Sequence, residues 1–174
     1  GIDDALICED QTIHLSGNVE NENNFYWTTT GDGTFNDSQV LSPIYTPGPN
    51  DKMAGTVNLN LIAEAIMPCT IADVSTTVLD IQLLPIANAS FDSETLICEN
   101  QSAQLMGSVA NESNFYWETS GDGTFDDAAL INAIYTPGTN DISSGSVVLS
   151  LTAEAVSPCS LADVSATVLD IQLL

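Results

Sequence analysis

The chain has 174 residues, of which 24 are acidic and only Lys52 is basic, so its formal net charge is −23. Nucleic acids and anionic membranes are bound through lysine and arginine, so this charge argues against both as partners. The apolar fraction of 44% is enough for a packed core. No run of 18 apolar residues is present that would span a membrane.

The chain is an internal repeat. A shift of 90 residues aligns it with itself without a gap, and 49 of the 84 aligned positions are identical. The segments NFYW, GDGTF, IYTPG and TVLDIQLL occur in both halves. Similarity at a fixed period indicates tandem domains. We therefore expect two domains, residues 1–84 and 85–174, and further copies of the same repeat in the same parent chain.

The first copy reads as a series of short strands. Residues 12–19 and 56–65 alternate apolar and polar side chains, residues 24–29 contain three consecutive aromatics, and residues 74–84 alternate again. The sequences GDG and TPGP between them are turn formers, and no window has the 3.6-residue stripe of a helix. This pattern predicts an all-β protein of tandem immunoglobulin-like β-sandwich domains.

The junction between the copies predicts an extra strand in the second one. Residues 85–92 alternate apolar and polar side chains, and the 90-residue offset leaves copy one without an equivalent. We therefore expect the first strand of copy one to be missing. An open sheet edge of this kind can pair with another strand. The junction contains Pro85 and no Gly/Ser tract, which predicts a stiff link.

Two segments resemble a known family. The WTTTGDGTF segment that begins at Trp27 and the IYTPG segment that begins at Ile44 resemble the W-x-x-G-D-G-T and Y-T-x-x-G patterns of PKD-type domains. With an Ile-Cys near the start and a second cysteine before the last strand, the arrangement is similar to the repeats of large Bacteroidota surface proteins, including gliding-motility adhesins. The resemblance covers both copies almost end to end. It implies an immunoglobulin-like (PKD-like) sandwich, export to the cell surface and a role in attachment.

Each copy has two cysteines 61 residues apart, Cys8 with Cys69 and Cys98 with Cys159. The repeated pair predicts one disulfide within each copy, and with it an oxidising, extracellular location. Two buried free thiols per copy are the alternative. No C-x-x-C spacing occurs, so we expect no zinc site.

Trp27 and Trp117 lie mid-strand between aromatic neighbours and are predicted to be core residues of the two sandwiches. Carbohydrate stacking is the alternative role for aromatics in this region. For that role Tyr26 and Tyr116 are better placed, because they face the other side of the strand.

Repeated aspartates are candidates for a calcium site, which needs six to eight oxygen ligands. The alternative is that they form turns, because aspartate bonds its own backbone there, and the EF-hand spacing is absent. The candidate ligands are Asp32, Asp37, Asp51 and Asp73 in copy one, and Asp122, Asp127, Asp141 and Asp163 in copy two.

The sequence does not indicate an enzyme. Its one histidine, His14, is replaced by Gln104 in copy two, and no G-x-S-x-G or phosphate-binding loop is present. Three functions remain: a stiff spacer in an extracellular adhesin, a fibre protomer with chains side by side, and a direct glycan- or protein-binding module. The near-identical loops of the two copies favour the first two, because binding modules diverge at their recognition loops.

Overall fold

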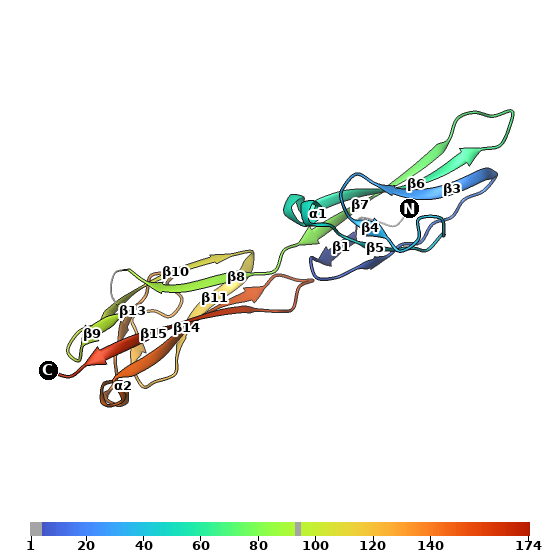
Figure 1. Cartoon of the computed structure of the whole chain (residues 1–174). Helices are drawn as coiled ribbons and strands as arrows, with labels where there is room; N and C mark the ends of the chain where they lie inside the picture. The colour runs from blue at the N-terminus through green and yellow to red at the C-terminus, as the bar shows by residue number, and fades with distance from the viewer. Residues whose placement is uncertain (1–4, 93–94) are drawn as a thin grey trace. The chain divides into compact units, whose positions relative to one another are not determined.

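The computed structural model of the chain describes residues 5–92 and 95–174, and nearly all of its regular structure is β-strand (Figure 1). The described chain divides into two compact units. Unit 1 runs to Leu83 and also takes in Ser157–Cys159, whereas unit 2 consists of Leu84–Val156 and Ser160–Leu174. The division lies one residue before the border we expected from the repeat, and a tripeptide of the second sequence copy belongs to unit 1.

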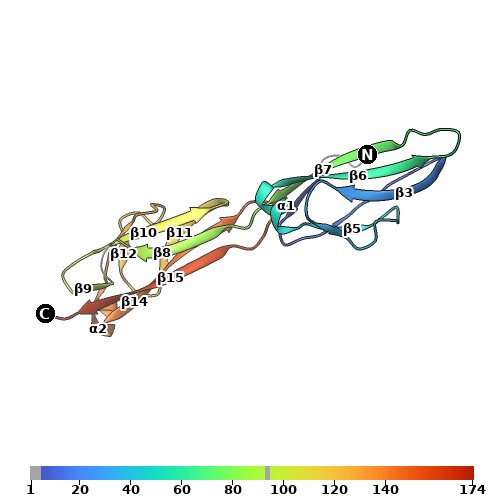
Figure 2. The same ribbon diagram turned by 45° about the horizontal axis from the view of Figure 1, so that its top comes forward.

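Unit 1 has two sheets, with strand orders β1-β7-β6-β3 and β2-β5-β4. β1 pairs with β7 in parallel, while the pairs β7–β6, β6–β3, β2–β5 and β5–β4 are antiparallel. Figure 2 shows β7, β6 and β3 side by side, with β5 across from them. The elements are β1 (Ala5–Cys8), β2 (Ile13–His14), β3 (Glu22–Thr29), β4 (Thr34–Phe35), β5 (Ile44–Thr46), α1 (Pro49–Ala54), β6 (Thr56–Ala65) and β7 (Asp73–Gln82).

Unit 2 repeats this plan with one strand more. Its sheets have the orders β11-β14-β15-β9 and β12-β13-β10-β8. The added strand is β8, which pairs antiparallel with β10. The elements are β8 (Ile86–Phe91), β9 (Leu96–Cys98), β10 (Ala103–Ala110), β11 (Glu112–Thr119), β12 (Thr124–Phe125), β13 (Ile134–Thr136), α2 (Thr139–Ser144), β14 (Ser146–Ala155) and β15 (Asp163–Gln172).

The two cores are built alike, which confirms the predicted β-sandwich. Trp27 and Trp117 are buried, as predicted, and their indole N–H groups donate to the carbonyls of Val40 and Ile131. Each of the nine core residues of unit 1 has an identical counterpart in the core of unit 2. The nine are Ile7, Leu15, Trp27, Tyr45, Val57, Leu59, Leu61, Leu79 and Ile81.

Each unit also contains a short helix of six residues that the sequence pattern did not predict. α1 begins at Pro49, where the fixed φ of proline suits the first helical position. It ends at Ala54 and is capped by Gly55, whose φ of +73° is readily adopted only by glycine. A helix of six residues is too short to show a 3.6-residue stripe, so only its start and stop residues mark it.

The strand expected at residues 12–19 is much shorter than predicted. β2 covers only Ile13–His14, while its counterpart β10 covers Ala103–Ala110. The alternation itself is as expected, since Leu15 is buried and His14 is exposed. The difference follows from strand pairing. β8 pairs with β10 from Leu105 to Ala110, and the described part of copy one contains no equivalent of β8.

Candidate functional site

The disulfide of the structure joins Cys8 to Cys159, with Cα atoms 4.9 Å apart. The two residues come from different sequence copies, but both belong to unit 1. The predicted pairs Cys8–Cys69 and Cys98–Cys159 are therefore wrong.

Strand geometry explains this correction. β1 runs parallel to β7 and places Cys8 opposite Gln82, at the end of β7, whereas Cys69 precedes the start of β7 at Asp73. A ten-residue strand is about 33 Å long, and the Cα atoms of a disulfide lie within about 7 Å of each other. A bond within the copy would have to span the whole strand. Cys159, in contrast, has its Sγ 3.3 Å from the carbonyl oxygen of Gln82.

The same argument applies to copy two, where Cys98 lies opposite Gln172 at the end of β15 and Cys159 precedes the start of that strand. Cys69 and Cys98 are free thiols, the first exposed and the second half-buried. Through the 90-residue offset they are the counterparts of Cys159 and Cys8. Each of the two bonded cysteines therefore has a counterpart in the other sequence copy that is a free thiol.

A second feature shared by both units is a buried carboxylate. In unit 1 the Asp51 side chain is 2% exposed. Its Oδ2 accepts hydrogen bonds from the Tyr45 hydroxyl (2.6 Å) and from the backbone N–H groups of Gly33 and Gly48 (3.0 Å each). Its Oδ1 accepts from the Asp32 N–H (3.1 Å). Four donors thus bind one carboxylate, which ties the GDG turn to the start of α1.

The two glycines of the GDG turn are required by this arrangement. A Cβ at Gly31 would collide with the Asp51 carboxylate, and a Cβ at Gly33 would collide with the Tyr45 ring. In return, the Asp32 carboxylate accepts from the backbone N–H groups of Asn50 and Asp51 in α1. The recurring GDGTF and YTPG motifs therefore encode a structural junction between loops.

Unit 2 repeats the junction. Asp141 is 3% exposed and accepts from the Tyr135 hydroxyl (2.6 Å) and from the N–H groups of Asp122, Gly123 and Gly138. Because Asp51 and Asp141 accept the same hydrogen bonds, the carboxylate has the same structural role in both units.

Burial and hydrogen bonding act in opposite directions on the pKa of Asp51. Burial raises the pKa, but the hydrogen bonds from Tyr45, Gly48, Asp32 and Gly33 outweigh it and hold the pKa below its ordinary value. Burial together with the hydrogen bond to Asp51 raises the pKa of the Tyr45 hydroxyl to about 12. Asp51 is therefore charged, and Tyr45 is a neutral donor, at neutral pH.

These pKa shifts predict an acid-labile contribution to stability. The folded chain holds the Asp51 proton more weakly than the unfolded chain, so the contribution is complete above about pH 4 and is lost as pH falls through the folded-state pKa. We expect the difference in unfolding free energy between the native chain and the Asp51→Asn variant to be largest at neutral pH and to shrink below about pH 4. Urea unfolding of both chains between neutral pH and about pH 3 measures this difference. The other carboxylates titrate in both chains, so their contributions cancel in the difference. A difference that stays constant into strong acid would contradict the assignment.

The described residues do not bring three or more of the predicted calcium ligands of either copy together. In copy one, Asp51 and Asp32 are engaged with backbone N–H groups, Asp37 accepts from the Gln39 N–H, and Asp73 starts β7. Within residues 5–92 and 95–174 no group of three or more Asp, Glu, His or Cys side chains could hold a metal ion. In copy two, Asp127 similarly accepts from the Ala129 N–H, and Asp163 starts β15. In each copy, three of the four aspartates bond backbone N–H groups of loops or of a helix start, and the fourth begins a strand.

In the described part of the chain, no helix has the length and apolar character needed to cross a membrane.

Comparisons with known proteins identify the fold. No protein-family model matches the chain, and no curated protein matches it in sequence. Among solved structures, it is similar to the protocadherin gamma B7 EC3-6 cis-dimer structure, with a TM-score of 0.56 and 11% identity over 99% of this chain and 46% of that one. Protocadherin gamma B2 extracellular cadherin domains 3-6 match with a TM-score of 0.56 and 13% identity over 98% of this chain and 45% of that one.

Mouse cadherin-23 EC22-24 also matches, with a TM-score of 0.51 and 11% identity over 99% of this chain and 63% of that one. The chain thus spans about half the length of the protocadherin structures. At these identities the likeness concerns the fold alone, and the resemblance to Bacteroidota adhesins stays a prediction. The likeness supports a fold of β-sandwich domains similar to those in the cadherin structures.

Proposed function

We propose that this chain is a structural repeat segment of an extracellular adhesin or cell-surface fibre, acting as a stiff spacer or assembly unit in attachment or gliding. The Cys8–Cys159 bond carries the proposal. It ties the first sequence copy to the loop between the last two strands of the following copy, in addition to the peptide link at Pro85. A covalent bond between consecutive repeats suits a part whose work is to transmit force.

Composition supports an extracellular setting. A disulfide persists in oxidising compartments, and a net charge of −23 keeps such a surface soluble and resists nonspecific association in a salty medium. The structural likeness to extracellular cadherin repeats agrees with an adhesion-type protein. The work proposed for these units is mechanical rather than catalytic.

The free thiols extend the proposal to longer arrays. Cys98 occupies the position of Cys8 and Cys69 that of Cys159, so in an array each would pair with a cysteine of the adjoining repeat. Each bond forms when two thiols give up two protons and two electrons to a disulfide oxidant such as oxidised glutathione, which is reduced to two thiols.

A three-copy chain tests this pairing. Leu174 corresponds to Leu84, so residues 85–174 can be appended once more after Leu174 without breaking the repeat. After oxidation by glutathione disulfide, we expect peptide mapping to find Cys98 bonded to the appended copy of Cys159. In the matched Cys98→Ser chain, the appended Cys159 should react fully with an alkylating agent. A bond inside the appended repeat, between its own two cysteines, would refute serial linkage.

The alternative function is a direct glycan- or protein-binding module. A binding assay separates it from the spacer. If the isolated two-repeat chain bound cells or glycans with the affinity and specificity of the whole protein, the module function would replace the spacer function.

A further inference from the structure

The outer face of one sheet in unit 2 carries a patch of exposed apolar side chains. β15 lies inside the sheet β11-β14-β15-β9, and Val164, Ala166 and Val168 follow one another on its outer face, while Leu169 between the sheets is fully buried. Val148 of β14 lies directly opposite Val168. The three valines are between 39% and 58% exposed, and the alanine is exposed as well. We call these four residues the valine patch.

The fold itself does not require apolar side chains at these places. Two of the four patch positions are polar in unit 1, where Asn58 replaces the valine of β14 and Thr76 replaces the alanine. The same sheet position is more apolar in unit 1 at Ile62, but its counterpart Thr152 is only 6% exposed and adds little surface. Because polar residues are accepted at matching positions of the same sheet, strand propensity alone does not account for the patch.

Three carboxylates surround the valine patch on the same face. Glu118 lies opposite Ser150, which in turn lies opposite Ala166. Asp170 follows the patch along β15, and Glu154 lies on the outer face of β14 toward the end of that strand. Glu118 and Asp170 are exposed, and Glu154 is half-buried. We call these three residues the acidic rim.

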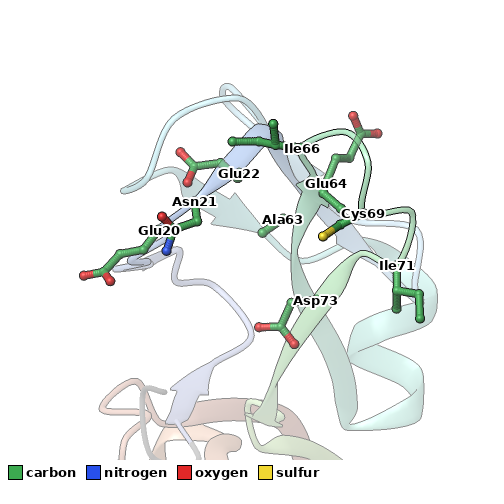
Figure 3. A pocket seen from close by; sticks show the side chains of 10 residues that line it. Glu20, Asn21, Glu22, Ala63, Glu64, Ile66, Cys69, Ile71 and Asp73 are labelled. Carbon is green, nitrogen blue, oxygen red and sulfur yellow. The ribbon is translucent and has the colours of Figure 1, made fainter.

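Unit 1 has only two of the three rim carboxylates. Glu64 and Asp80 correspond to Glu154 and Asp170, whereas Thr28 stands in the place of Glu118. Asp73 pairs with Ala63, the residue before Glu64, so the side chains of Asp73 and Glu64 belong to opposite faces of the sheet. Figure 3 shows their carboxylates pointing apart. The corresponding face of unit 1 is therefore both less apolar and less acidic.

Unit 2 has no cation of its own to neutralise the rim. Residues 85–174 contain twelve acidic side chains and no lysine, arginine or histidine. A second copy of the chain brings a single lysine, Lys52, with a formal net charge of −23, so two copies repel each other. An apolar centre with a charged rim suits a partner whose own apolar centre is flanked by the opposite charge. The surface therefore fits a basic partner better than a second copy.

We propose that the valine patch and its acidic rim bind a cationic amphipathic segment of another protein. The segment lays an apolar stripe along β15 and extends lysine or arginine side chains to Glu118 and Asp170. An amphipathic helix fits this face, because lysine stems cover apolar surface while their ammonium groups reach a polar edge. This inference goes beyond the spacer function and rests on unit 2 alone, without the disulfide.

The probe is a synthetic helix of about 18 residues with a leucine stripe and lysines on both flanks. We expect it to bind the 174-residue chain in a fluorescence anisotropy titration. In methyl NMR spectra the signals of Val164 and Val168 should shift at lower peptide concentration than those of Val74 and Val78, their counterparts in unit 1. A scrambled peptide of the same composition keeps the charge but loses the stripe, and it should bind at least about tenfold more weakly.

Paired variants separate the patch from general attraction between a cationic peptide and an acidic chain. Val164→Thr with Val168→Thr keeps the charge and the β-branched shape but removes apolar surface, and should weaken binding at least about tenfold. Val74→Thr with Val78→Thr makes the same change in unit 1 and should alter the affinity by less than about twofold. Urea unfolding of both double variants verifies that each is folded.

The rim is tested by Glu118→Thr, which introduces the residue that unit 1 has at this place. It should weaken binding about two- to fivefold at low salt, and the difference should vanish at about 0.5 M salt.

Equal binding of the two peptides, or equal affinity of the two double variants, would overturn the inference. So would a dimer of the native chain in sedimentation equilibrium that the Val164→Thr, Val168→Thr variant does not form, because the occupant would then be a second copy. None of these readouts measures extension under force or attachment, so a failure here is distinguishable from a failure of the spacer function.

Discussion

Pulled by its two ends, the oxidised chain is expected to extend far less than the reduced chain. The Cys8–Cys159 bond removes residues 9–158 from the path of the force, so that only the 24 residues 1–8 and 159–174 carry load. At roughly 3.5 Å per residue, the fully extended length is about 80 Å for the oxidised chain and about 600 Å for the reduced one. The contrast depends on the covalent path alone.

Single-molecule force spectroscopy with and without reductant measures both lengths. The Cys8→Ser variant should show the long extension even without reductant. The matched variant Cys69→Ser also loses one thiol but keeps the bond, so it should behave as the native chain does. If the oxidised native chain extended as far as the Cys8→Ser variant, the bond would not carry load and the spacer function would lose its main support.

The parts of the fold that could be predicted from sequence are those that local alternation determines. Residues 56–65 and 74–84 alternate because one face of each strand is buried, and they form β6 and β7. Trp27 was placed in the core because a bulky aromatic in mid-strand has few other places to pack, and it is 5% exposed. The extra strand of copy two was visible for the same reason and is β8.

The cysteine pairing could not be predicted because it depends on non-local geometry. Four cysteines allow three pairings, and the equal 61-residue spacing favoured the local one. Only the parallel pairing of β1 with β7 places Cys8 at the end of the strand remote from Cys69. Likewise, the shortening of residues 12–19 to β2 depends on the partner strand and not on their own sequence.

The aspartate junction was missed for another reason. Asp32 and Asp51 lie 19 residues apart, and their types and loop positions suit a metal ligand as well as a structural carboxylate. The distinguishing signal was the neighbourhood of Asp51. Asp51 lies three residues after Gly48, which precedes the helix, so its carboxylate can accept from the N–H groups at the helix start, and a tyrosine precedes it by six residues. That combination indicates that the carboxylate organises the loop, because the backbone N–H groups and the tyrosine hydroxyl already supply its hydrogen-bond donors.

The Asp51→Asn substitution is expected to destabilise unit 1 by about 2–3 kcal/mol. An asparagine keeps the volume but replaces one carboxylate oxygen by an N–H₂ donor. With its amide oxygen at the Oδ2 position, the asparagine can still accept from Tyr45, Gly33 and Gly48, but its N–H₂ group then faces the N–H donor of Asp32, and the charge that strengthens all four bonds is lost. Buried donors without an acceptor lose their hydration without compensation. The Tyr45→Phe variant removes only one donor and should cost about 1–2 kcal/mol.

Asp37→Asn is the matched control, because Asp37 is exposed and asparagine can still accept from the Gln39 N–H. It should change the unfolding free energy by no more than about 0.5 kcal/mol. Urea unfolding followed by hydrogen exchange resolves unit 1 from unit 2, in which the Asp141→Asn variant should reproduce the large effect through Tyr135. A loss for Asp51→Asn as small as that for Asp37→Asn would mean that the carboxylate does not organise the loops. The conserved identity of the GDG and YTPG segments between the copies would then need a role outside the fold.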